Sequence, residues 1–60
     1  MKKRYKAYIA GNRYSEAFDS CMGMTPEDAT KAIKRKTGPD YKNCYIWVVY
    51  IHLSGEEEKI

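Results

Sequence analysis

The sequence predicts a small α+β domain of order ββαβ, in which one helix packs on one face of a three-stranded antiparallel sheet. Three observations lead to this fold class: an apolar stretch at residues 44–53, helix start and stop signals around residues 26–37, and alternating side chains near the start of the chain. With 60 residues, of which 43% are apolar, the chain is expected to form one domain. Residues 55–60 are expected either to fray as an acidic tail or to add a short fourth strand.

The first strand is indicated by two sets of side chains that alternate along residues 3–10. This alternation predicts a half-buried strand with one apolar and one basic face. The members of the two sets are Lys3, Tyr5, Ala7 and Ile9, alternating with Arg4, Lys6, Tyr8 and Ala10.

Gly11 and Asn12 follow this strand and favour a two-residue type II′ turn into a second strand. Glu16 would then lie on the apolar face opposite Ala7, so the alternative interpretation is a helical turn through residues 15–21. The register of the two-residue turn predicts three other cross-strand pairs: Tyr5 with Phe18, Ile9 with Tyr14, and Arg4 with Asp19.

The helix is predicted over residues 26–37. Thr25 is a good N-cap, Pro26 suits the first helical position, and acidic and basic side chains lie in the first and last turns, where they complement the helix dipole. Gly38 and Pro39 end the helix. Its apolar stripe is thin, so it buries little of a sheet. The stripe consists of Ala29, Ala32 and Ile33.

The last predicted strand, CYIWVVYIHL at residues 44–53, is rich in β-branched and aromatic side chains and has two largely apolar faces. It is expected beside the first strand, giving the spatial order 2-1-3. One helix covers only one face of a sheet, so the other is left to water, to a second copy or to a partner. The two faces hold Tyr45, Trp47, Val49, Ile51 and Leu53, and Cys44, Ile46, Val48, Tyr50 and His52.

The basic start of the chain runs into Tyr5 and Lys6 without an apolar segment, which argues against a signal peptide. The apolar stretch at 44–53 is too short to span a membrane. We therefore expect a cytoplasmic protein in which Cys21 and Cys44 are reduced thiols. The alternative is a disulfide between them, worth about 3 kcal/mol, in an oxidising compartment.

Few residues suit catalysis. His52 is the only histidine, and no second titratable group can be placed beside it from sequence. The chain holds no phosphate loop and no C-x-x-C metal pair. Met22 and Met24 offer soft ligands, but methionines that lead into a helix usually fill a core. We expect no enzyme activity, no catalytic residue, no metal and no cofactor, and the sequence does not indicate a small-molecule substrate.

The uncovered sheet face predicts a non-enzymatic protein-binding module, with a homodimer as one way to cover that face. Tyrosine and tryptophan are common binding hot spots, and we therefore favour them over the lysines as anchors. The candidate protein-binding residues are Tyr8, Ile46, Trp47, Val48, Tyr50 and His52.

The alternative function is a nucleic-acid-binding module on the basic face of the first strand. Lysine and arginine on a sheet face contact phosphates, while tyrosine stacks on bases. Asp19 and the glutamates near the end of the chain would repel phosphate, and the net charge of +3 permits such a partner without requiring it. The candidate residues are Lys2, Arg4, Lys6 and Arg13.

Residues 23–29, Gly-Met-Thr-Pro-Glu-Asp-Ala, resemble the G-x-T-x-E-E-A corner of HicB-type antitoxin domains, which also have antiparallel strands before the helix. The resemblance covers residues 5–37 and implies an antitoxin-like regulator, although the separate DNA-binding segment usual in such antitoxins is not seen here. In size and layout the chain also resembles some phage-encoded anti-CRISPR inhibitors, which occlude a site on a host nuclease or its guide complex. This likeness implies a small inhibitor in the host cytoplasm, and neither resemblance assigns a functional residue.

Overall fold

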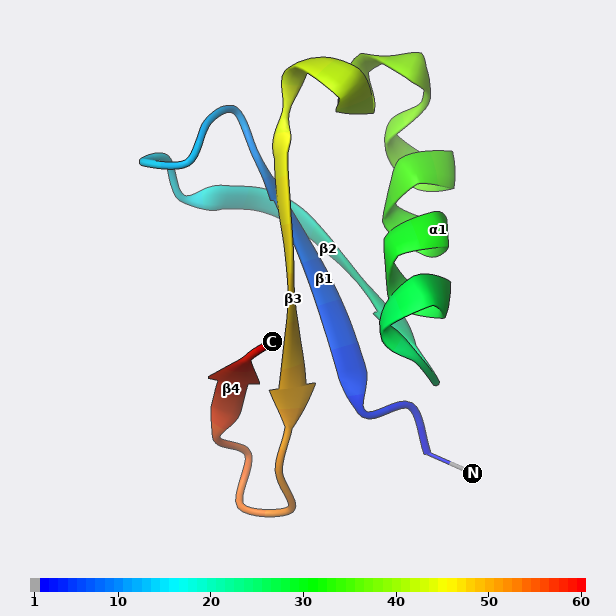
Figure 1. Ribbon diagram of the computed structural model, residues 1–60, viewed down its shortest axis with the longest axis vertical. Helices are drawn as coiled ribbons and strands as arrows, with labels where there is room; N and C mark the ends of the chain where they lie inside the picture. Colours follow the sequence, from blue (N-terminus) through cyan, green and yellow to red (C-terminus); the bar gives the residue numbers. More distant parts are fainter. Residues whose placement is uncertain (1) are drawn as a thin grey trace.

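The computed structural model describes residues 2–60 and has one α-helix against a four-stranded antiparallel sheet of order β2-β1-β3-β4 (Figure 1). The predicted α+β class and the spatial order 2-1-3 are confirmed, and the charged tail adds the fourth strand at an edge. The strands are β1 (Tyr5–Ala10), β2 (Ala17–Gly23), β3 (Tyr45–Ile51) and β4 (Glu57–Lys59), and the helices are α1 (Pro26–Thr37) and a 3-10 helix, η1 (Pro39–Asn43).

Helix α1 has the predicted bounds because its end signals are local. The Thr25 hydroxyl accepts a hydrogen bond of 3.0 Å from the backbone N–H of Asp28. At the other end, the N–H of Gly38 donates to the carbonyl of Lys34 at 2.9 Å. Gly38 has φ +82°, a backbone conformation that favours glycine, so the chain turns sharply there into η1. Sequence patterns had not predicted η1.

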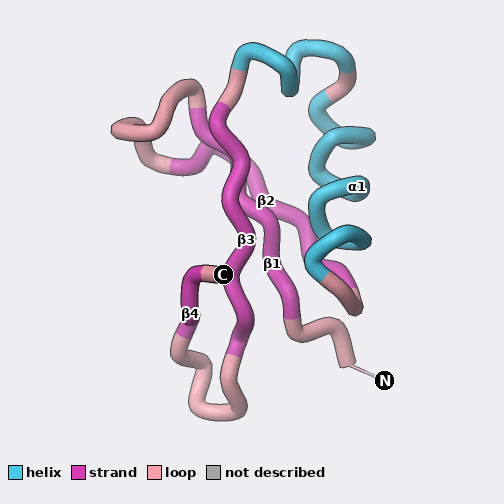
Figure 2. Tube along the Cα trace, viewed as in Figure 1, coloured by secondary structure: helices cyan, strands magenta, loops and turns pink. Residues whose placement is uncertain are grey.

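The core lies between α1 and one face of the sheet. Ala7 and Ile9 of β1 and Ala29 and Ile33 of α1 are fully buried and pack together. Two of these four side chains are alanines, so α1 can approach β1 and β2 closely, and Figure 2 shows it running along one side of the strands. The half-buried residues around this core are Tyr5, Cys21, Tyr41, Cys44, Ile46 and Val48.

Gly23, at the end of β2, lies against the backbone of α1. A Cβ atom built on Gly23 would stand 2.3 Å from the backbone N of Ala29 and 2.7 Å from its Cα. No side chain fits in that space, so the contact between β2 and the start of α1 requires glycine.

The predicted register of the first hairpin is wrong. Strand β2 begins only at Ala17, so a longer loop of residues 11–16 replaces the two-residue turn. Tyr5 pairs with Gly23 instead of Phe18, and the pairing slips again between Ile9 and Ala10. The helical turn considered for residues 15–21 is also wrong, because most of this segment is strand β2.

The loop between β1 and β2 is built around Asn12. The side-chain oxygen of Asn12 accepts a hydrogen bond of 2.8 Å from the N–H of Tyr14, and its carbonyl accepts one of 3.2 Å from the N–H of Ser15. An asparagine side chain that closes a turn in this way competes with the two-residue hairpin. Glu16 is consequently exposed in the loop. The predicted register would have placed it on the apolar face of the sheet.

The edge strand β2 carries a polar contact to the helix. Asp19 accepts a hydrogen bond of 3.0 Å from Lys36 Nζ and another of 2.8 Å from the backbone N–H of Ser20. The hydrogen bond from Lys36 holds the pKa of Asp19 below its ordinary value, with the Ser20 N–H adding to the effect. Asp19 therefore faces α1 and lies opposite Ile9, rather than opposite Arg4 as the predicted register had it.

Two further features bear on the sequence analysis. Cys21 and Cys44 are both free thiols in half-buried positions beside the core. Among residues 2–60, no helix has the length and apolar character needed to cross a membrane.

Candidate protein-binding surface

The second face of the sheet carries side chains on the side away from α1. Paired residues of neighbouring antiparallel strands point to the same face, and Tyr8 of β1 pairs with Trp47 of β3. The residues of β1 on either side of Tyr8, Ala7 and Ile9, point toward the helix instead. We call this second surface the open face; it is formed by Lys6, Tyr8, Phe18, Ser20, Met22, Tyr45, Trp47, Val49, Ile51, Glu57 and Lys59.

Three aromatic rings cross the middle of the open face. The Tyr8 and Trp47 rings are stacked with their centroids 5.3 Å apart and their planes at 21°. Trp47 also contacts Tyr45, with centroids 5.6 Å apart and planes at 32°. These rings, which we call the aromatic row, are half-buried among themselves with no helix over them. Ring pairs of this kind hold each other in fixed orientations, so the surface is preorganised.

Apolar side chains extend the aromatic row toward β2. Phe18 is 61% exposed and lines a shallow hollow together with Tyr8 and Ser20, and Met22 is exposed further along β2. Large apolar side chains that remain in water on one contiguous sheet face are typical of interaction sites.

Basic groups surround the row. Lys6 Nζ lies 4.9 Å from the centre of the Tyr8 ring, and Lys59 Nζ lies 5.9 Å from that of Tyr45. Arg4 continues the alternation of β1, and its carbonyl accepts a hydrogen bond from the N–H of Ile51. These cations give the rim of the open face a positive charge.

Glu57 is the one carboxylate of the open face, and it is engaged by Tyr8. The Tyr8 hydroxyl lies 2.7 and 2.8 Å from the two carboxylate oxygens of Glu57 and donates its hydrogen bond to them. Burial raises the pKa of Tyr8 above its ordinary value, and the hydrogen bond to Glu57 raises it further. The hydroxyl therefore keeps its proton and ties β4 to β1.

The six predicted protein-binding residues do not form one surface. Tyr8 and Trp47 lie on the open face, whereas Ile46 and Val48 pack against the core under α1. Tyr8 pairs with Trp47 and so shares its face, and the two residues lie on the opposite side of the sheet from Ile46 and Val48.

Tyr50 and His52, the remaining two predicted residues, lie on the helix side near the end of β3. The Tyr50 ring meets the rings of Tyr5 and His52 edge-on, at centroid distances of 5.3 and 4.9 Å. His52 Nε2 is 2.7 Å from a carboxylate oxygen of Glu58. These contacts link the β3–β4 hairpin together and place His52 away from the open face.

The predicted nucleic-acid residues are also divided. Lys6 lies on the open face, and Arg4 follows the same alternation. Lys2 precedes β1 and is exposed, while Arg13 lies in the β1–β2 loop near the start of β3. The predicted register placed Asp19 opposite Arg4, where its negative charge would repel phosphate. In the structure Asp19 instead faces α1 and binds Lys36.

Several residues of the open face are not among the candidates predicted from the sequence. Tyr45 could have been found, because it alternates with Trp47 along the same strand. Phe18 and Lys59 could not, since their positions depend on the register of β2 and on the formation of β4. Among residues 2–60, no three His, Cys, Asp or Glu side chains gather where they could hold a metal ion.

Comparisons of the chain with protein-family models, with curated proteins and with solved structures give no match.

Proposed function

We propose that this protein is a binding module that docks its open face on a partner protein. The observation that carries the proposal is the aromatic row of Tyr8, Trp47 and Tyr45, which crosses a sheet face that α1 does not cover. Tyrosine and tryptophan supply a disproportionate share of binding energy at protein interfaces, particularly at the centre of the contact.

The charges on the open face favour a partner with a complementary surface. Lys6 and Lys59 lie beside the rings of the aromatic row, and Arg4 precedes them in the alternation of β1, while Glu57 is already bound by Tyr8. A partner that presents apolar side chains at the centre and carboxylates at the rim would match both features. Rim charges of this kind mainly speed association and select the partner, whereas the rings supply affinity.

The size of the chain is compatible with this role. A standard interface buries roughly 800 Å² on each partner, which is less than a fifth of the 4430 Å² accessible surface of the chain. One sheet face can therefore provide the whole contact. A module of this kind acts by occupying a surface of its partner, which is the inhibitory role that the resemblance in layout implies.

The test compares the affinity of open-face variants for a captured partner with the affinity of a matched control variant. The immobilised protein is used to capture a partner, which is then purified for measurement of its Kd with each variant. Phe18→Ser and Trp47→Ala are expected to weaken binding by at least tenfold, about 1.4 kcal/mol or more. The control Leu53→Ser removes an apolar side chain that is more exposed than Phe18, 88% exposed in the turn after β3, and should leave Kd unchanged.

Circular dichroism of each variant establishes that the fold is kept before Kd is compared. If the captured protein binds Phe18→Ser as tightly as it binds Leu53→Ser, the open face is not the contact surface. If capture disappears after nuclease treatment and is also lost in Phe18→Ser, a nucleic acid and not a protein occupies the open face. Either result would refute the proposal.

A further inference from the structure

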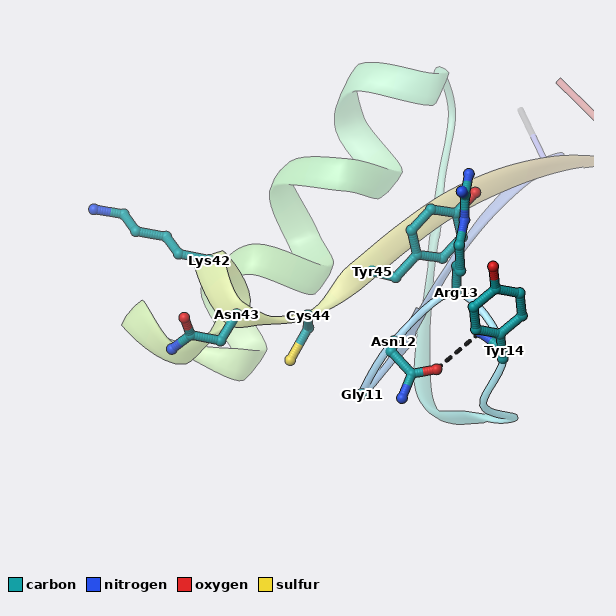
Figure 3. Close-up of a pocket in the computed structure, with 8 residues that line it drawn as sticks. All are labelled: Gly11, Asn12, Arg13, Tyr14, Lys42, Asn43, Cys44 and Tyr45. Carbon is teal, nitrogen blue, oxygen red and sulfur yellow. Dashed lines mark hydrogen bonds between the residues drawn. The ribbon is translucent and has the colours of Figure 1, made fainter.

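A groove lies at the end of the sheet where the β1–β2 loop approaches η1 and the start of β3. Figure 1 shows this loop and η1 at the same end of the molecule, with the β3–β4 turn at the other end. The groove has a volume of ≈ 590 Å³. Among the described residues, its lining consists of Gly11, Asn12, Arg13, Tyr14, Lys42, Asn43, Cys44 and Tyr45 (Figure 3).

We propose that this groove binds a nucleoside phosphate, either as a free nucleotide or as a unit of a single-stranded nucleic acid. This site goes beyond the proposed docking surface and does not require a protein partner, although the two share Tyr45. The two sources share the same chemistry, an aromatic base next to a phosphate, and the groove offers partners for both parts.

The base would be held by tyrosine rings. Tyr14 is 89% exposed although it lies in a loop whose backbone is fixed by the side chain of Asn12. Tyr45, the end of the aromatic row, contributes a second ring to the same groove and contacts Trp47. Stacking on an aromatic side chain contributes to the binding of any base, because every base has a π face.

The phosphate would be held by the cations of the groove. Of the eight described residues that line it, Arg13 and Lys42 are positively charged and none is acidic. In Figure 3, Arg13 lies beside the rings of Tyr14 and Tyr45, whereas Lys42 extends from η1 in the direction away from these rings. This separation suits one phosphate beside the stacked base and a second one further along a strand.

The two asparagines add neutral hydrogen-bonding groups. Asn43 contributes a side-chain amide at the η1 end of the groove, where it can donate to or accept from a base or sugar. Asn12, which also lines the groove, uses its side-chain oxygen for the turn, and its NH₂ group remains available as a donor. Cations, rings and amides are groups that bind the phosphate, base and sugar of a nucleotide.

The first test is a titration of the ¹⁵N-labelled full chain followed by NMR. Adenosine 5′-monophosphate, adenosine and a five-nucleotide single-stranded oligoadenylate are added separately. We expect the amide signals of residues 11–14 and 42–45 to shift with the monophosphate, and at least tenfold weaker binding of adenosine, because it lacks the phosphate. Tighter binding of the oligonucleotide than of the monophosphate would assign the site to single strands, and equal affinity would assign it to free nucleotides.

The second test uses charge-matched variants. Arg13→Glu is expected to weaken binding of the preferred ligand by roughly tenfold or more, and Tyr14→Ala by a comparable factor. Lys31→Glu makes the same charge change on the exposed side of α1, outside the groove, and should alter Kd less than twofold. Leu53→Ala is the matched control for Tyr14→Ala.

Two outcomes would overturn the proposal. One is the absence of amide shifts around the groove at millimolar nucleotide and oligonucleotide. The other is equal weakening by Arg13→Glu and Lys31→Glu, which would reveal attraction to overall positive charge without a site.

Discussion

Gly23 marks the closest approach between the sheet and the helix. We expect Gly23→Ala to destabilise the protein, because the new Cβ would stand 2.3 Å from the backbone N of Ala29, and backbone on both sides must move to admit it. Overpacking of this kind costs about 1–3 kcal/mol, which is large beside the roughly 3–5 kcal/mol that a core of this size supplies. Urea unfolding followed by circular dichroism measures the loss.

Gly11→Ala is the matched control for this substitution. A Cβ at Gly11 would meet no atom within 4 Å, and the residue lies in an exposed loop. Its urea midpoint should therefore stay close to that of the wild type. Equal midpoints for Gly23→Ala and Gly11→Ala would contradict the close contact between β2 and α1.

Individual residues explain why only part of the candidate surface could be predicted from the sequence. Trp47 and Tyr8 were identified because exposed aromatic side chains are favoured at binding sites. Their common face was not recognised, because it follows from the pairing of Tyr8 with Trp47, and alternation alone does not tell which strands share a face. Lys59 was missed because it reaches the open face only through β4.

Among the elements, the helix could be predicted and the first hairpin could not. Helix α1 is determined by neighbours in the sequence, from the N-cap Thr25 to the C-terminal Gly38. The hairpin depends on two features that local patterns do not contain. These are the turn closed by the Asn12 side chain and the contact of Gly23 with the helix, which together set the start and end of β2.

The contact between Lys36 of α1 and Asp19 of β2 is expected to make stability depend on pH. The hydrogen bond from Lys36 holds the pKa of Asp19 below its ordinary value in the folded state. The stabilisation from this pair is therefore fully present above the unfolded pKa of aspartate, about 3.9. It is lost as the pH falls through the lower, folded pKa.

The variant Lys36→Met removes this contribution while keeping the length of the side chain. Thermal unfolding is measured for both proteins between pH 2 and pH 6. We expect the wild type to have the higher Tm near pH 6, and the difference in Tm to shrink as the medium becomes more acidic. A difference that stays constant over the whole range would show that Lys36 acts by packing and not through Asp19.

On the scale of the whole molecule, the fold has a single layer of helix on one side of the sheet. Ring stacking fixes the aromatic side chains of the open face, and the positively charged Lys6 and Lys59 lie on the same surface. Two copies that met through this face would bring these like charges together, which disfavours self-association. We therefore expect sedimentation equilibrium at micromolar concentration to give the mass of one chain.

Phe18→Ser is the informative variant for this measurement. If the wild type sediments as a dimer and Phe18→Ser as a monomer, a second copy covers the open face and the search for a partner should leave that surface. A wild-type monomer leaves the aromatic row available, as the proposed function requires.

The Asp19 side chain also determines how the sheet can meet another chain. It accepts a hydrogen bond from the N–H of Ser20, and this occupies a backbone donor in the middle of β2, an outer strand. The opposite outer strand, β4, has only three residues, all charged. Short, charged or internally satisfied edges are how sheets avoid templating cross-β fibrils. The two margins of the sheet are therefore poor templates for strand-by-strand polymerisation, although the flat of the sheet exposes an aromatic surface to water.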